Sequence, residues 1–180
     1  NMWPGYFKNE LHIGYVTNGV HFPTWVASNL RRLYERYFPK GFNSHVYNIP
    51  EWQGVHKIDD AELWNERIAL KTRLINHIRK RYSDPAQARF DSPRQMVKVV
   101  ESIRPDVLTI GFARRFATYK RAHLLFTNLD RLSKLVNNPE RPVQFIFAGK
   151  AHPHDIPGQD LIKRIVEVSK MPEFLGKIVF

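Results

Sequence analysis

The chain has 180 residues, and a composition of 43% hydrophobic and 13% aromatic residues excludes an intrinsically disordered protein. It has no cysteine, which excludes disulfides, thiolate metal sites and cysteine nucleophiles and suits a cytoplasmic protein. No apolar run approaches the length of a membrane span, so we expect no membrane as a partner. The formal net charge of +11 is spread evenly and predicts attraction to anions, with nucleic acid and phosphorylated metabolites as the alternatives.

The first part of the chain is predicted to be rich in loops. Residues 1–23 combine glycine, proline, aromatic and short polar residues, which indicates loop with one short strand at Leu11–Val16. Apolar residues at helical spacing then predict a helix over residues 24–38, with Thr24 as its N-cap. Residues 39–58 are again expected to be loop.

Two further helices are predicted ahead of the first strand of a sheet. The longer one covers residues 59–82 and is capped by aspartate. Its buried side is expected to consist of Leu63, Trp64, Ile68, Ile75, Ile78 and Tyr82. The shorter helix covers residues 92–103 and has a proline in its first turn.

Beyond residue 104 the sequence alternates between strands and helices. Short apolar runs predict strands at residues 107–112, 143–148 and 177–180, and amphipathic runs predict helices at residues 118–136 and 159–169. This β-α-β-α-β order is typical of an α/β protein with a parallel, Rossmann-like sheet. We therefore expect a loop-rich and then helical segment over residues 1–104 and the first half of an α/β domain over residues 105–180.

The turn that follows the first predicted strand is unusually cationic. Residues 111–121 read Gly-Phe-Ala-Arg-Arg-Phe-Ala-Thr-Tyr-Lys-Arg. Ligands bind at the carboxyl ends of strands in open α/β sheets, and the start of a helix adds free N–H groups and a positive dipole end. Arg115 at the strand end and Lys120 in the first helical turn therefore predict a site for a doubly negative ligand such as phosphate. The alternative is a solvated basic loop.

The turn after the second predicted strand repeats this arrangement. Gly149 lets the backbone approach a ligand closely, and Lys150 adds a charge at the strand end, although a tight turn that needs glycine explains the pair equally well. His152 and His154 follow Lys150 at once. Because no further ligands stand at a familiar spacing, these histidines favour an exposed loop over a metal site, and no metal is expected.

A third turn has the sequence Thr-Asn-Gly-Val-His over residues 17–21. Its Asn-Gly pair favours a turn that tolerates positive φ. The amide of Asn18 offers both donors and acceptors, so it can bridge two sugar hydroxyls, and an ordinary turn is the alternative.

Three motifs make the chain similar to a known family: Ile-Gly-Tyr-Val-Thr-Asn-Gly-Val-His over residues 13–21, the cationic segment over residues 111–121, and Phe-Ala-Gly-Lys-Ala-His-Pro over residues 147–153. The chain resembles the α-glucan (glycogen, starch and maltodextrin) phosphorylases, most closely their short bacterial type. The resemblance implies part of the C-terminal lobe of a glycosyltransferase-B fold, with the active site between two lobes. It also implies reversible phosphorolysis of α-1,4-glucans such as maltodextrin by inorganic phosphate, which gives glucose 1-phosphate with retained configuration.

The resemblance assigns roles to individual residues. Pyridoxal phosphate is the cofactor of the family, and its 5′-phosphate acts beside the substrate phosphate. Arg115 and Lys120 match the residues that hold the substrate phosphate, in agreement with the analysis of the cationic turn. Arg114 matches a cation near the cofactor phosphate, and Asn18 and Tyr119 match residues that contact the glucose.

The resemblance also implies that parts of the enzyme are missing from this chain. The cofactor lysine of the family lies in a glycine-rich motif that does not occur before Phe180, and Phe180 falls inside a predicted central strand. We therefore expect a piece of a longer enzyme that by itself holds no pyridoxal phosphate and is inactive. We expect no nucleic acid or membrane partner, and homo-oligomerisation of the longer protein stays possible.

Two other functions remain as alternatives. A sugar-nucleotide-dependent glycosyltransferase of the same fold, such as a glycogen or starch synthase, also holds phosphates with Arg and Lys at a strand-to-helix turn. The long Arg-Arg-Phe-Ala-Thr-Tyr-Lys-Arg segment favours a phosphorylase over that enzyme. A polyanion-binding module is the second alternative, although the cations are dispersed along the chain rather than gathered in a stripe.

Overall fold

The structure is a computed structural model that describes residues 4–7, 10, 14, 16–84 and 92–180. The chain divides into two compact units, Asn1–Asp60 and Ala61–Phe180. The sequence predicts a boundary at residue 104, between the leading loop-rich and helical segment and the strands of the sheet. That boundary stays a prediction. The strand expected at Leu11–Val16 lies mostly outside the described residues. Within the described residues, no helix is both long and apolar enough to cross a membrane.

The first unit is built from short helices. They are the α-helices α1 (Phe22–Trp25) and α2 (Ser28–Tyr37) and the 3₁₀ segments η2 (Phe42–Ser44) and η3 (Ile49–Lys57). The single helix expected over residues 24–38 is therefore wrong, because Val26 and Ala27 are extended and separate α1 from α2. Thr24 lies inside α1, where a proline in the first turn starts the helix earlier. The loop expected over residues 39–58 contains η2 and η3 instead.

Aromatic rings form the core of the first unit. Ring centroids lie 4.3 to 6.5 Å apart within a cluster of Phe22, Tyr34, Phe38, Phe42 and Trp52. Gly54 is buried against the cluster, and a Cβ at this position would lie 1.9 Å from Cδ1 of Phe38. Only glycine lets η3 pack this closely on the rings.

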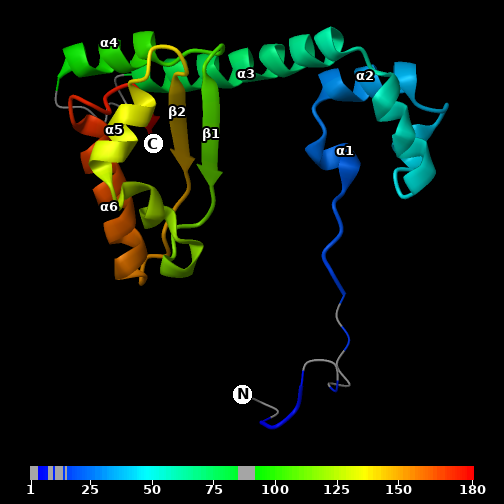
Figure 1. The fold of residues 1–180 in the computed structure, drawn as a ribbon, viewed down its shortest axis with the longest axis horizontal. Helices are drawn as coiled ribbons and strands as arrows, with labels where there is room; N and C mark the ends of the chain where they lie inside the picture. Colours follow the sequence, from blue (N-terminus) through cyan, green and yellow to red (C-terminus); the bar gives the residue numbers. More distant parts are fainter. Residues whose placement is uncertain (1–3, 8–9, 11–13, 15, 85–91) are drawn as a thin grey trace. The chain divides into compact units, whose positions relative to one another are not determined.

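The second unit contains the predicted parallel sheet. Its strands are β1 (Leu108–Ala113), β2 (Val143–Ala148) and β3 (Ile178–Val179), in the order β1-β2-β3. Both strand pairs are parallel, and β1 and β2 are in register from Leu108 opposite Val143 to Ala113 opposite Ala148. The prediction of an α/β fold with a partial Rossmann-like sheet is confirmed (Figure 1).

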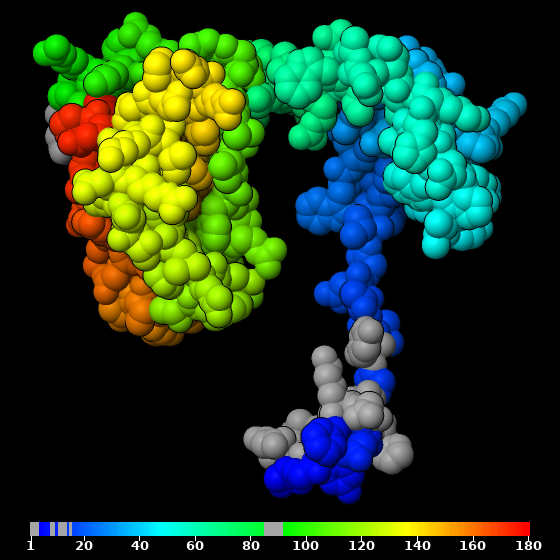
Figure 2. All heavy atoms as spheres, in the orientation of Figure 1, coloured from blue at the N-terminus to red at the C-terminus, as the bar shows by residue number. Residues whose placement is uncertain are grey.

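Helices cover both faces of this sheet. They are α3 (Asp60–Ser83), α4 (Pro93–Ser102), α5 (Leu129–Val136) and α6 (Ile156–Lys170). Because side chains alternate along a strand, Phe145 and Phe147 of β2 pack with α5 and α6, whereas Ile146 packs with α3 and α4. In the space-filling view, side chains fill the space between the elements of this unit (Figure 2). The carboxyl ends of β1 and β2 therefore extend from a packed core.

The helix expected over residues 118–136 is wrong. The segment forms two 3₁₀ turns, η5 (Thr118–Lys120) and η6 (Ala122–Phe126), and only its last part is the α-helix α5. Arg121 interrupts the segment with a left-handed conformation (φ 57°), and Asn128 starts α5 by accepting a hydrogen bond from the N–H of Arg131. The apolar residues of this segment do have helical spacing, but the local backbone conformation breaks the segment into three short elements.

The other helices follow the expectations more closely. α4 is capped by Ser92, whose hydroxyl accepts a hydrogen bond from the N–H of Gln95 at 3.3 Å. α6 begins three residues earlier than expected. On the expected buried side of α3, Ile75 and Ile78 are buried, whereas Trp64 is 64% exposed. The prediction that Trp64 is buried is therefore wrong.

A buried glutamine ties the amino end of the sheet to the turn before it. The side chain of Gln144 is 2% exposed. Its amide donates to the carbonyl of Arg104 and to the hydroxyl of Thr109, each at 2.8 Å, and its oxygen accepts the N–H of Arg104 at 3.1 Å. A side-chain amide is needed here because the partners include both a donor and an acceptor.

We expect Gln144→Leu to lower the free energy of unfolding by about 1–3 kcal/mol, because the leucine leaves polar groups of the turn without their partner. Urea unfolding of the 180-residue chain measures the change. Thr109→Val is the control. It removes one of the three contacts of Gln144, together with the hydrogen bond from the Thr109 hydroxyl to the Val107 carbonyl, and should still cost less. Equal losses in both variants would contradict the role assigned to Gln144.

Candidate functional site

The cationic turn leaves the carboxyl end of β1. Arg114 and Arg115 directly follow the strand, and Tyr119 and Lys120 lie in η5. The structure thus brings these four predicted residues into one short segment. Lys120 is the last residue of a three-residue 3₁₀ turn, so the prediction that it lies in the first turn of an α-helix is wrong. The physical reason is the left-handed Arg121, which ends the turn.

Phe116 anchors the middle of this turn. Its side chain is 1% exposed and lies 5.3 Å from the ring of Phe112 and 5.5 Å from the ring of Phe180, measured between centroids. Its N–H donates to the carbonyl of Lys150 at 3.0 Å. Burial of this one aromatic holds the arginines that precede it at the edge of the sheet.

Two glycines allow neighbouring segments to approach the cationic turn. A Cβ at Gly149 would lie 2.1 Å from the carbonyl oxygen of Arg114, and a Cβ at Gly158 would lie 2.5 Å from the carbonyl oxygen of Phe116. Gly158 belongs to the first turn of α6, where its N–H donates to the carboxylate of Asp155 at 2.9 Å. The turns after β1 and β2 and the start of α6 are therefore in close contact along one edge of the sheet.

Within the part of the chain that the structure describes, no acidic side chain pairs with the charges at this edge. Arg114, Arg115 and Lys150 are exposed, and the Nζ atom of Lys120 lies 4.8 Å from the ring centroid of Tyr119. Ion pairs between described residues, such as Arg104–Asp106, Lys163–Asp160 and Arg164–Glu167, do not include any of these four cations. The edge is thus suited to bind an anion.

At the amino end of β1, in contrast, an arginine is paired with an acidic residue. Arg104 forms a hydrogen-bonded ion pair with Asp106. The hydrogen bond from Arg104 lowers the pKa of the Asp106 carboxyl group below its ordinary value. Among the residues that the structure describes, positive charge is therefore paired with a carboxylate at the amino end of the strand but not at its carboxyl end.

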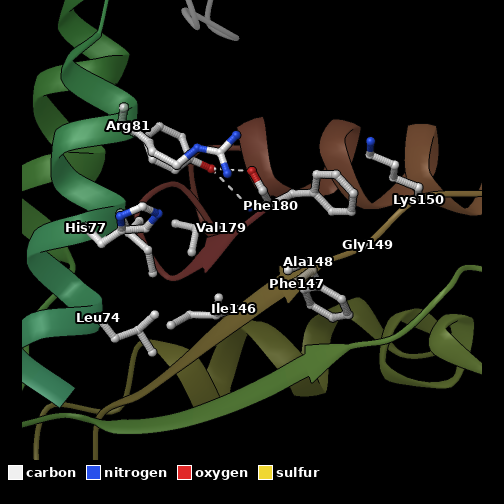
Figure 3. Close-up of a pocket in the computed structure, with 12 residues that line it drawn as sticks. Leu74, His77, Arg81, Ile146, Phe147, Ala148, Gly149, Lys150, Val179 and Phe180 are labelled. Carbon is white, nitrogen blue, oxygen red and sulfur yellow. Dashed lines mark hydrogen bonds between the residues drawn. The ribbon is translucent and has the colours of Figure 1, made fainter. Parts of the chain in front are cut away.

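A cavity of about 400 Å³ adjoins the turn after β2 (Figure 3). It lies between α3 and the carboxyl ends of β2 and β3. Leu74, Ile146 and Val179 contribute apolar walls, and His77 and Lys150 contribute polar groups. Sequence reasoning missed His77, because this residue belongs to no motif and stands among the exposed residues of an amphipathic helix.

The other residues singled out by the sequence analysis are exposed. Tyr119 is 69% exposed, and Asn18 is an exposed residue of the first unit. Their contacts with glucose stay predictions. His152 and His154 are exposed, with ring centroids 5.5 Å apart. The described residues contain no group of three or more side chains that could hold a metal ion.

We expect Gly149→Ala to destabilise the chain by about 1–3 kcal/mol, because the new Cβ meets a backbone oxygen and forces the two turns apart. Amide hydrogen exchange should also become faster at Phe116, which loses its partner in this turn. Thermal unfolding and exchange measure the two effects. Gly111→Ala is the control, since no heavy atom lies within 4 Å of that Cβ. Normal stability of Gly149→Ala would contradict the close contact between the turns after β1 and β2.

Comparisons with known proteins identify relatives of the chain. No protein-family model matches the chain. The chain is 48% identical to a glycogen phosphorylase of Aquifex aeolicus, 40% identical to a maltodextrin phosphorylase of Thermococcus litoralis and 37% identical to a glycogen phosphorylase of Mycobacterium tuberculosis. Each comparison covers 99% of the chain but only 26%, 21% and 20%, respectively, of the relative. The resemblance inferred from the three motifs is confirmed.

Proposed function

Because the chain is homologous to glycogen and maltodextrin phosphorylases along 99% of its length, we propose that it forms part of an α-glucan phosphorylase. The proposed reaction is the reversible phosphorolysis of α-1,4-glucans by inorganic phosphate to glucose 1-phosphate. The protein that contains this chain is then a hexosyltransferase with a glycosyltransferase-B fold. The absence of cysteine agrees with a cytoplasmic location.

One observation carries this proposal: Arg114, Arg115 and Lys120 share one turn at the carboxyl end of a parallel strand and have no ion-pair partner among the described residues. Phosphorolysis needs such a site because a phosphate dianion must approach the glucosidic carbon. Arginine binds phosphate through a fork of donors, and lysine acts as a point charge. Cations held in place by a packed core provide that charge without reorganisation.

Arg115 and Lys120 are proposed to hold the attacking phosphate. The segment that carries them is fixed by the buried ring of Phe116 and by its hydrogen bond to Lys150. Preorganised charges of this kind orient the nucleophile and stabilise the charge that develops in the transition state. Tyr119 and Asn18 are proposed to contact glucose hydroxyls, which would orient the sugar.

Arg114 is proposed to face the phosphate group of pyridoxal phosphate. Arg114 is exposed and is the first residue after β1, and Gly149 packs closely against its backbone carbonyl. The donor set fits a phosphate group, because an unpaired guanidinium offers two parallel N–H donors. When bound, the cofactor would supply a second phosphate group beside the substrate phosphate. Two phosphates in contact repel one another, so the arginines would also reduce this repulsion.

We expect Lys120→Ala in the protein that contains this chain to lower the rate of phosphorolysis about a hundredfold, which corresponds to about 3 kcal/mol. The affinity for maltodextrin should change little, because the lost charge faces phosphate and not the glucan. Release of glucose 1-phosphate at saturating phosphate measures the rate. Lys134→Ala removes an exposed charge from the last turn of α5 and should have no effect.

Arg115→Lys should lower the rate at least about tenfold, because an ammonium keeps the charge but loses the fork of donors. The same assay measures this variant. Near-normal turnover of both Arg115→Lys and Lys120→Ala would remove the basis of the proposal. An enzyme that transfers glucose from a nucleotide sugar and not from glucose 1-phosphate would indicate the synthase alternative instead.

A further inference from the structure

The first two strands of the sheet end level with each other. Their register runs to Ala113 opposite Ala148, and the N–H of Phe116 then donates to the carbonyl of Lys150 at 3.0 Å. In a parallel ladder, this bond forms when the residue before the donor is paired with the acceptor residue. The bond therefore places the backbone of Lys150 beside that of Arg115.

Two positively charged residues are therefore neighbours on adjacent strands. Arg115 and Lys150 are both exposed, and no carboxylate among the described residues forms an ion pair with either of them. Like charges on neighbouring strands are destabilising unless something compensates them. An anion between them supplies that compensation, and phosphate matches the combination of a guanidinium and an ammonium.

None of the interactions recorded between described residues uses the charge of Lys150. Its contact with the cationic turn is made by its backbone carbonyl, and the close approach beside it is made by Gly149. The side chain extends along the edge of the cavity between α3 and the strand ends (Figure 3). A substitution that removes only the ammonium therefore leaves the structural contacts of this turn in place.

We propose that Lys150 is a further phosphate-binding residue, which holds a phosphate dianion together with Arg115 at the carboxyl ends of β1 and β2. The inference deepens the proposed function and rests on it for the identity of the phosphate. That phosphate is either inorganic phosphate or the phosphate group of pyridoxal phosphate. Both sources share the chemistry that the two cations recognise, so the experiment distinguishes them.

The first arm of the experiment titrates the 180-residue chain with inorganic phosphate and follows backbone amide shifts at the turns after β1 and β2. Lys150→Met keeps the apolar stem and removes the charge, so we expect about a tenfold loss of affinity. Lys150→Arg keeps the charge and should stay within about threefold of the unaltered chain. Lys134→Met, at the end of α5, is the matched control and should not change the affinity.

The second arm uses the whole protein loaded with its cofactor. If Lys150 holds inorganic phosphate, Lys150→Met should raise the KM for phosphate about tenfold and leave pyridoxal phosphate bound during dialysis. If Lys150 holds the cofactor phosphate, the KM should stay constant while bound cofactor, measured by its absorbance, is lost faster. Either result supports the proposal and identifies the phosphate.

The proposal is overturned if Lys150→Met matches the unaltered protein in phosphate affinity, in KM and in cofactor retention. Thermal unfolding of each variant checks that the fold is intact. A whole protein without phosphorolysis would refute the proposed function separately. The titration of the chain would then still decide whether Lys150 binds phosphate.

Discussion

The burial of Phe116 is the constraint on which the candidate site depends. The ring is 1% exposed, so the turn that carries it cannot leave the edge of the sheet without exposing a large apolar surface. Its N–H is bonded to Lys150, and its carbonyl is covered by Gly158 at the start of α6. The exposed arginines before it are therefore held in position by an apolar side chain and by backbone contacts, and not by interactions of their own charges.

This arrangement separates stability from binding. Aliphatic and aromatic clusters on both faces of the sheet stabilise the second unit, and Gln144 satisfies the polar groups at its amino end. The carboxyl end gathers cations that have no acidic partner among the described residues. Charges of one sign at a single edge oppose folding, and such local conflict is expected where a protein binds a charged ligand.

The first unit solves a different packing problem. It is short, and its described helices are too brief to bury a broad aliphatic face. Five aromatic rings pack against one another instead, with Gly54 against the ring of Phe38, since large rings bury much area per residue. The prediction of loops over residues 39–58 failed for this reason: the contacts that form η2 and η3 link rings far apart in the sequence, and helical spacing does not reveal them.

The sequence by itself determined the parallel sheet, its strands and the cationic turn, because apolar periodicity and strand-to-helix order depend on local patterns. It also predicted that Arg115 would lie at the end of a strand. Tertiary structure alone decided that Lys120 lies in a 3₁₀ turn, that Trp64 is exposed and that Lys150 lies beside Arg115. These features depend on one left-handed residue, on which face of a helix finds a partner, and on the register of two strands, and none of them leaves a periodic signal in the sequence.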